Sequence, residues 1–206
     1  MKILKCMVIA GLISLITGSF LAGDSQLEKG RGLCSPRWLY LSKGTDADVS
    51  RAALRTLFPD SGSALVIEES TRSRPLRASW VSAELHDIPL DALDELVKSY
   101  LERNQEVAQF QAGLLPEGAQ VVAAQEIEKM FADDMETGWK QFRQRYGDTA
   151  ILVSLSLPGY ALDRQSALIH VRRSRGPLAG ESSILILRRV AQGDWQVVAE
   201  AQVAAS

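Results

Sequence analysis

The sequence predicts an α+β fold, and two patterns of apolar residues support this prediction. Between residues 89 and 146 the apolar residues recur at three- and four-residue intervals, which is the period of amphipathic helices. After Gly147 they alternate with polar residues, which is the period of half-buried strands. We therefore expect a C-terminal four-stranded antiparallel β-meander packed against two amphipathic helices, with one or two further strands from the N-terminal half.

The two central helices are predicted from their apolar stripes. The first covers residues 89–109, with Asp87 as a candidate N-cap and Pro89 in the first turn. The second covers residues 123–146, and Gly138 inside it permits a close approach or a local break. Aromatic side chains at helical spacing mainly supply buried area, so the stripe of the second helix is interpreted as core rather than as a cofactor site. Its members are Ile127, Met130, Phe131, Met135, Trp139, Phe142 and Tyr146.

Four strands are predicted in the C-terminal part of the chain. They cover residues 151–157, 167–171, 184–186 and 195–203. Their connections are rich in Pro and Gly, and strands so closely spaced favour an antiparallel meander over parallel crossovers, which need about a dozen or more residues. We expect Trp139 on the second helix and Trp195 in the last strand to be buried, and Trp195 to share a face with Val197 and Ala199.

The N-terminal half contributes less regular patterns. A helix is expected over residues 49–57, ending before Pro59. Two further strands are expected over residues 64–67 and 79–85. In domain terms, we expect a signal peptide at 1–23, an irregular leader at 24–43 and a single α+β domain at 44–206.

Residues 1–23 have the order of a secretory signal peptide. Lys2 and Lys5 are followed by an apolar run and then by the small residues Ala22 and Gly23. This pattern predicts an exported protein, periplasmic or extracellular, with no permanent membrane span after cleavage. The alternative is an uncleaved membrane anchor, because the run reaches the short limit of the roughly 17–25 residues that cross a bilayer. After cleavage Cys34 is the only cysteine, so any disulfide has to be intermolecular.

Charge argues against nucleic acid as a partner. The chain has 23 basic and 25 acidic residues, and loss of Lys2 and Lys5 with the signal peptide leaves a net charge of −4. Nucleic-acid binding requires a clearly basic surface. The charge is uneven, however, because residues 84–137 carry a net charge of −10 and residues 138–206 a net charge of +4.

A set of short motifs between residues 125 and 198 resembles an uncharacterised family of secreted bacterial proteins. The chain departs from that pattern at Gly147-Asp148, where a Pro-containing turn is expected, and at Tyr160, where Phe is expected. The resemblance implies an exported domain and carries no activity with it. The matching residues are Glu126, Phe131, Gly138-Trp139, Phe142, Tyr146, Leu155-Ser156, Gly159-Tyr160, Gln165, Ala167-Leu168, Gly176-Pro177-Leu178-Ala179-Gly180 and Asp194-Trp195-Gln196-Val197.

The sequence shows no pattern of a catalytic, metal or cofactor site. Its two histidines, His86 and His170, are far apart, and no HExxH, CxxC, GxSxG, P-loop or GxGxxG motif is present. The acidic residues Asp133, Asp134 and Glu136 lie opposite the apolar stripe and are interpreted as a solvated helix face. We therefore expect no cofactor and no metal.

The best candidate for a binding site is the basic strand near residue 170. Alternation places His170 beside Arg172 on one face, opposite Ala167, Ile169 and Val171. Tyr160 and Arg164 lie in the preceding loop. These side chains could bind an anionic ligand or protein partner, and the alternative is an ordinary solvated sheet face.

The function class that these observations favour is a non-enzymatic binding or protein-interaction domain, because catalysis usually leaves a recognisable nucleophile, base or metal set. One alternative is an enzyme whose site is assembled from scattered sheet and loop residues. Another is a structural component of the cell envelope, for which a large exposed apolar patch would be the sign.

Export is testable by N-terminal sequencing of protein recovered from outside the cytoplasm. The signal pattern predicts a mature chain that begins near Asp24. Recovery of an intact chain beginning at Met1 that stays in the membrane after alkaline washing would contradict cleavage.

Overall fold

The computed structural model describes residues 45–59, 62–69, 71, 93–105, 107–110, 115–116, 118–191 and 193–205. All of them belong to one compact unit, Arg37–Ser206. The predicted signal peptide, the leader, Cys34 and the predicted strand at 79–85 lie outside the described residues. Within the described segments, every helix is too short or too polar to cross a membrane.

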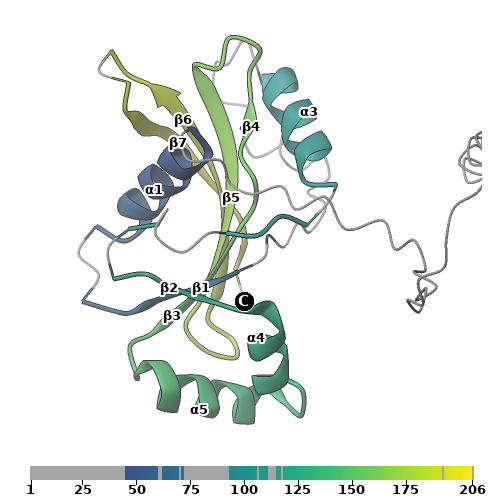
Figure 1. The fold of residues 1–206 in the computed structure, drawn as a ribbon, viewed down its shortest axis with the longest axis vertical. Coiled ribbons are helices and arrows are strands. Elements are labelled where there is room, and N and C mark those ends of the chain that lie inside the picture. The colour runs from purple at the N-terminus through teal and green to yellow at the C-terminus, as the bar shows by residue number, and fades with distance from the viewer. Residues whose placement is uncertain are drawn as a thin grey trace, which may run out of the picture. The chain divides into compact units, whose positions relative to one another are not determined.

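The structure confirms the α+β fold (Figure 1). Four of its helices are described: α1 (Thr45–Leu57), α3 (Leu93–Arg103), α4 (Ala124–Met130) and α5 (Met135–Tyr146). The described strands are β1 (Leu65–Glu68), β2 (Gln120–Val122), β3 (Ile151–Leu155), β4 (Gly159–Tyr160), β5 (Ser166–Ser174), β6 (Gly180–Arg189) and β7 (Trp195–Ala205).

The seven strands form one mixed sheet with the order β2-β1-β3-β5-β6-β7, and β4 pairs with the start of β5. Strands β3, β5, β6 and β7 form the predicted antiparallel meander. Strand β1 is parallel to both of its neighbours, β2 and β3. Long connections that contain helices separate β1 from both partners in sequence, and such connections allow parallel pairing.

Both faces of the sheet are covered by helices. On β5, Ile169 packs in the cluster that contains Val49 and Leu54 of α1, whereas its neighbour Leu168 packs in the cluster that contains Leu96 and Tyr100 of α3. Successive side chains of a strand point to opposite faces, so α1 and α3 cover opposite sides of β5. Helices α4 and α5 pack on Val66 and Leu152 of β1 and β3, on the same face as α3.

The predicted helix at 123–146 is in fact two helices, and the prediction of one continuous helix was wrong. Helix α4 ends at Met130 with Phe131 as its C-cap, and Asp134 is the N-cap of α5, whose side chain accepts the Thr137 N–H at 2.8 Å. Asp is a strong N-cap residue, and capping here replaces the hydrogen bonds of a continuous helix. The apolar period continues across the break because both helices bury the same stripe against the sheet, except for Met135, which was predicted in the core but is 52% exposed.

Helix α3 ends at Arg103, six residues before the predicted end at 109. The side chain of buried Asn104 explains the end: its Oδ1 accepts the Leu157 N–H at 2.8 Å, and its Nδ2 donates to the Leu157 carbonyl at 2.9 Å. The Asn104 side chain is therefore hydrogen-bonded to the loop after β3. Val107, which falls within the predicted helix at 89–109, lies outside α3 and is exposed.

Trp139 and Trp195 are buried as predicted, with 3% and 6% of their surface exposed. The prediction that Ala199 shares a face of the sheet with Trp195 and Val197 was wrong. A bulge in the β6–β7 pairing, between Ile186↔Ala199 and Leu187↔Val197, inserts one residue into β7. Ala199 therefore packs with the α3 cluster, while Trp195 and Val197 pack on the α1 side.

Gly138 permits a close approach of α4 to α5. A Cβ atom at this buried position would overlap the Phe131 ring and lie 2.9 Å from the Met130 carbonyl oxygen. We expect Gly138→Ala to lower the free energy of unfolding by about 1–3 kcal/mol through overpacking, although Ala is the better helix former.

Urea denaturation measures this effect, with Gly62→Ala as the matched control. A Cβ at Gly62 has no atom within 4 Å, so this control is expected to change stability by less than about 0.5 kcal/mol. A Gly138→Ala variant as stable as the control would show that the two helices do not need this contact.

Candidate functional site

The structure does not bring the four predicted site residues together. His170 and Arg172 share one face of β5 with Leu168, as the alternation predicts. His170 is only 7% exposed, because this half of the strand is covered. Arg172 lines a pocket beside α5, whereas Tyr160 and Arg164 line a different pocket beside α3.

The pocket beside α3, here called the α3 pocket, has a volume of about 840 Å³ and a largely charged lining. It lies between the start of α1, one side of α3 and the β4–β5 turn. Its lining residues are Thr45, Asp46, Glu95, Lys98, Ser99, Glu102, Arg103, Tyr160, Ala161, Leu162 and Arg164.

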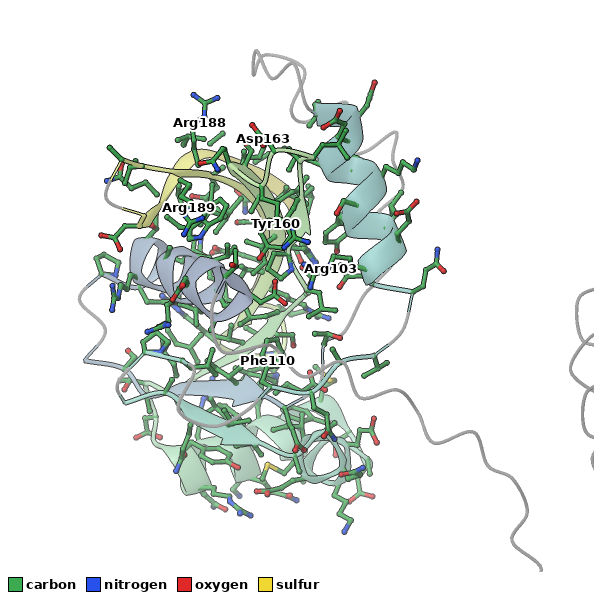
Figure 2. The ribbon with its side chains drawn as sticks, turned by 45° about the horizontal axis from the view of Figure 1, so that its top comes forward. Arg103, Phe110, Tyr160, Asp163, Arg188 and Arg189 are labelled. Atoms are coloured by element: carbon green, nitrogen blue, oxygen red, sulfur yellow. The ribbon has the colours of Figure 1, made fainter. Side chains whose placement is uncertain are left out.

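A compact cluster of Asp46, Arg103 and Tyr160 borders the α3 pocket; we call it the Asp46 cluster. The Arg103 guanidinium donates to both carboxylate oxygens of Asp46, at 3.1 and 2.8 Å. The Tyr160 hydroxyl donates to Asp46 Oδ1 at 2.6 Å, and the Arg103 guanidinium lies 5.1 Å from the centre of the Tyr160 ring. Figure 2 shows Arg103 and Tyr160 next to each other in the space between α1 and α3.

The Asp46 cluster joins three elements that are distant in sequence, namely α1, α3 and β4. Burial, the Asp46 charge and the hydrogen bond to it together raise the pKa of Tyr160 well above its usual value. The backbone of Tyr160 is held against α3, because its N–H donates to Ser99 Oγ at 2.9 Å. Gly159 allows this approach, since a Cβ there would overlap the backbone of Tyr100. The cluster satisfies its own charges and therefore acts as a structural link.

The pocket beside α5, here called the α5 pocket, has a volume of about 320 Å³. One wall is mainly apolar and comes from α4, the turn after it and α5: Ile127, Glu128, Phe131, Met135 and Trp139. The sheet supplies the other, largely polar wall: Glu68, Leu152, Ser154, Arg172 and Ser174. Predominantly apolar cavities with a few placed polar groups are typical of ligand sites, whose volumes start at about 300 Å³.

Three side chains form a polar row across the sheet in this pocket. Ser154 of β3 pairs with Arg172 of β5, and the Ser154 hydroxyl donates to Glu68 Oε2 of β1 at 3.0 Å. A carboxylate, a hydroxyl and a guanidinium thus follow one another on three adjacent strands. Adjacent strands lie about 4.8 Å apart, so Glu68 and Arg172 occupy positions roughly 10 Å apart on the sheet.

Arg172 is an exposed cation in this row, and its side chain makes no hydrogen bond or ion pair with another described residue. The contrast with the next residue is clear. Arg173 points to the opposite face and forms an ion pair with Glu181, donating from Nε to Oε2 at 2.6 Å. The guanidinium of Arg172 is therefore available to an anion.

Trp139 packs between two other aromatic rings in the apolar wall. Its ring makes edge contacts with Phe131 and Phe142, with ring centres 5.4 and 5.2 Å away. The indole N–H is buried and meets no acceptor among the described residues. A buried hydrogen-bond donor without an acceptor typically lowers the stability of the folded protein by about 1–3 kcal/mol.

Sequence reasoning placed Arg172 and Trp139 correctly but did not connect them, because their proximity depends on how α5 crosses the sheet. It also missed Glu68, Asp46 and Arg103. Glu68 did carry a signal, since it directly follows the apolar run Leu65–Ile67 at a strand end. Nothing in the local sequence around Asp46 or Arg103 indicates that they form an ion pair 57 residues apart.

Among the residues that the structure describes, no three His, Cys, Asp or Glu side chains gather closely enough to hold a metal ion. Comparisons of the chain with protein-family models, curated proteins and solved structures find no match. The site must therefore be interpreted from its own chemistry.

Replacing Tyr160 with Phe tests the Asp46 cluster. The variant is expected to lower the free energy of unfolding by about 1.5–3 kcal/mol at neutral pH, because a hydrogen bond to a charged group is lost. The raised pKa gives this loss a pH dependence. A raised folded-state pKa means that the contribution of the hydroxyl is complete below about pH 10 and declines as the pH rises further.

Chemical denaturation between pH 7 and pH 11 measures both effects, and the stability gap between wild type and Tyr160→Phe should narrow above about pH 10. Tyr100, whose pKa burial raises to about 12, is present in both proteins and cancels. Tyr146→Phe is the matched control, because its partner Glu126 has a side chain 31% exposed, against 11% for Asp46. Equal losses in the two variants would contradict a special role for the cluster.

Proposed function

We propose that this chain is an exported, non-enzymatic binding domain and that the α5 pocket is its binding site. The observation that carries the proposal is Arg172, an exposed guanidinium without an acidic partner among the described residues, set opposite an aromatic wall. A charged group beside an apolar surface is what a site needs to recognise a ligand that has one charged end and one apolar end.

The N-terminal signal pattern supports export to the periplasm or the extracellular space. The resemblance to secreted bacterial proteins of unknown activity supports the same location. Binding rather than catalysis is favoured by the chemistry of the α5 pocket. Its polar row consists of the Glu68 carboxylate, which already accepts a hydrogen bond from the Ser154 hydroxyl, and of the Arg172 guanidinium, which is a hydrogen-bond donor and not a base.

A concave pocket favours binding of a small ligand, or of one side chain of a partner protein, over binding of the flat surface of a partner protein. The sequence left both options open, along with an anionic partner at a basic sheet face. Arg172 lines the α5 pocket, whereas His170 is buried. Of the four predicted site residues, only Arg172 is therefore proposed to contact the ligand.

A fragment screen by NMR tests the proposal. We expect hits whose largest chemical-shift changes fall on the Trp139 indole N–H and on Met135 and Arg172. Arg172→Gln is expected to weaken anionic hits about tenfold or more, since charge-assisted hydrogen bonds contribute about 1.5–3 kcal/mol.

Arg188→Gln is the matched control. Arg188 is also an exposed arginine of the sheet, but it does not line the α5 pocket (Figure 2). It is expected to leave the affinity of these hits unchanged within about twofold, because exposed charges outside a contact have little effect on affinity. Hits confined to other surfaces, or equal effects of the two variants, would contradict the proposed site.

A further inference from the structure

The Arg172 guanidinium defines the chemistry of a ligand of the α5 pocket. It has no acceptor among the described residues. A guanidinium donates hydrogen bonds and cannot accept them. A ligand that satisfies it therefore presents acceptor oxygens, and a planar carboxylate matches a guanidinium with two parallel hydrogen bonds.

The acidic residues of the same pocket limit the charge of the ligand. Glu68 and Glu128 both line the pocket, and Glu68 is only 2% exposed. Carboxylates that line a pocket repel an anion more strongly as its charge increases, because the repulsion grows with the product of the two charges. This arrangement favours a singly charged carboxylate over a doubly charged phosphate.

The opposite wall defines the rest of the ligand. Ile127, Phe131 and Trp139 offer aliphatic and aromatic surface, and Met135 is 52% exposed beside them. Methionine is unbranched and adapts its shape to what it contacts. A volume of about 320 Å³ lies at the lower end for ligand pockets, so one apolar group fits better than a long chain or a large ring system.

We propose that the α5 pocket binds a monocarboxylate whose body is a single apolar or aromatic group. The carboxylate accepts from Arg172, and the apolar group lies against Trp139 and Met135. The same chemistry is found in a free apolar carboxylic acid and in the apolar C-terminal residue of a peptide. This inference rests on the proposed function, because it names the ligand class of the same pocket.

The test compares matched charged and neutral probes against the purified protein. The free-acid pair is 3-phenylpropionate and 3-phenylpropionamide, and the peptide pair is acetyl-Ala-Ala-Phe with a free or an amidated C-terminus. Binding is measured by titration calorimetry and by the NMR signal of the Trp139 indole N–H, assigned with Trp139→Phe. Phenyl phosphate serves as the doubly charged probe.

We expect at least one acid to bind about tenfold or more tightly than its amide, and phenyl phosphate to bind more weakly than 3-phenylpropionate. Arg172→Gln should remove the preference for the acid, whereas Arg188→Gln should preserve it. The tighter of the two acids identifies the source of the carboxylate, and either result supports the inference.

The outcomes separate this inference from the proposed function. Acids and amides that bind the pocket equally, or a preference that survives Arg172→Gln, would overturn the carboxylate assignment and leave the pocket as a binding site. If the four acid and amide probes do not bind but other fragments shift the NMR signals of Trp139 and Met135, the carboxylate assignment is also overturned and the pocket remains a binding site. If no compound of any class perturbs the pocket, both the ligand class and the proposed function are wrong.

Discussion

The structure depends on the need of strand β5 to bury side chains on both of its faces. Ala167, Ile169 and Val171 pack under α1, and Leu168 packs under α3. A strand buried on both faces requires two helical layers, and apolar burial of this kind contributes about 25 cal/mol per Å². The first six residues of β5 are buried and Arg172 is exposed, so the double cover ends within this strand.

The α5 pocket lies where this cover ends. Helix α3 packs over the end of the sheet that contains Leu168, Ile184 and Ile186, and α4 and α5 pack over the β1–β3 end. Figure 1 shows these two groups of helices at opposite ends of the sheet. Between them the sheet presents polar side chains to the α5 pocket, namely Glu68, Ser154, Arg172 and Ser174.

Much of this fold could be predicted from local patterns, since a period of 3.6 or 2 is a property of a short segment. Helix α1, strand β1 and the meander follow from such patterns. Several features did not, among them the break between α4 and α5, the early end of α3, the bulge beside Val198, and the parallel pairing of β1. Capping by Asp134 competes locally with helix continuation, and the bulge and the pairing depend on strand register, which a single segment does not encode.

The site shows the same division. Alternation correctly placed His170 and Arg172 on one face, but it could not show that His170 is covered and Arg172 is not. Tyr160 and Arg164 are close to this strand in sequence and still line a different pocket, because β4 turns toward α3. Long-range packing decided which of the predicted side chains meet, and sequence proximity did not.

The central claim is that Arg172 is held in the α5 pocket for an anionic ligand. A crystal structure of the protein grown with 3-phenylpropionate measures this most directly. We predict the carboxylate within about 3 Å of the Arg172 guanidinium nitrogens and the phenyl ring against Trp139. An Arg172 side chain that instead forms an ion pair with Glu68 or Glu128 above an empty pocket would contradict it.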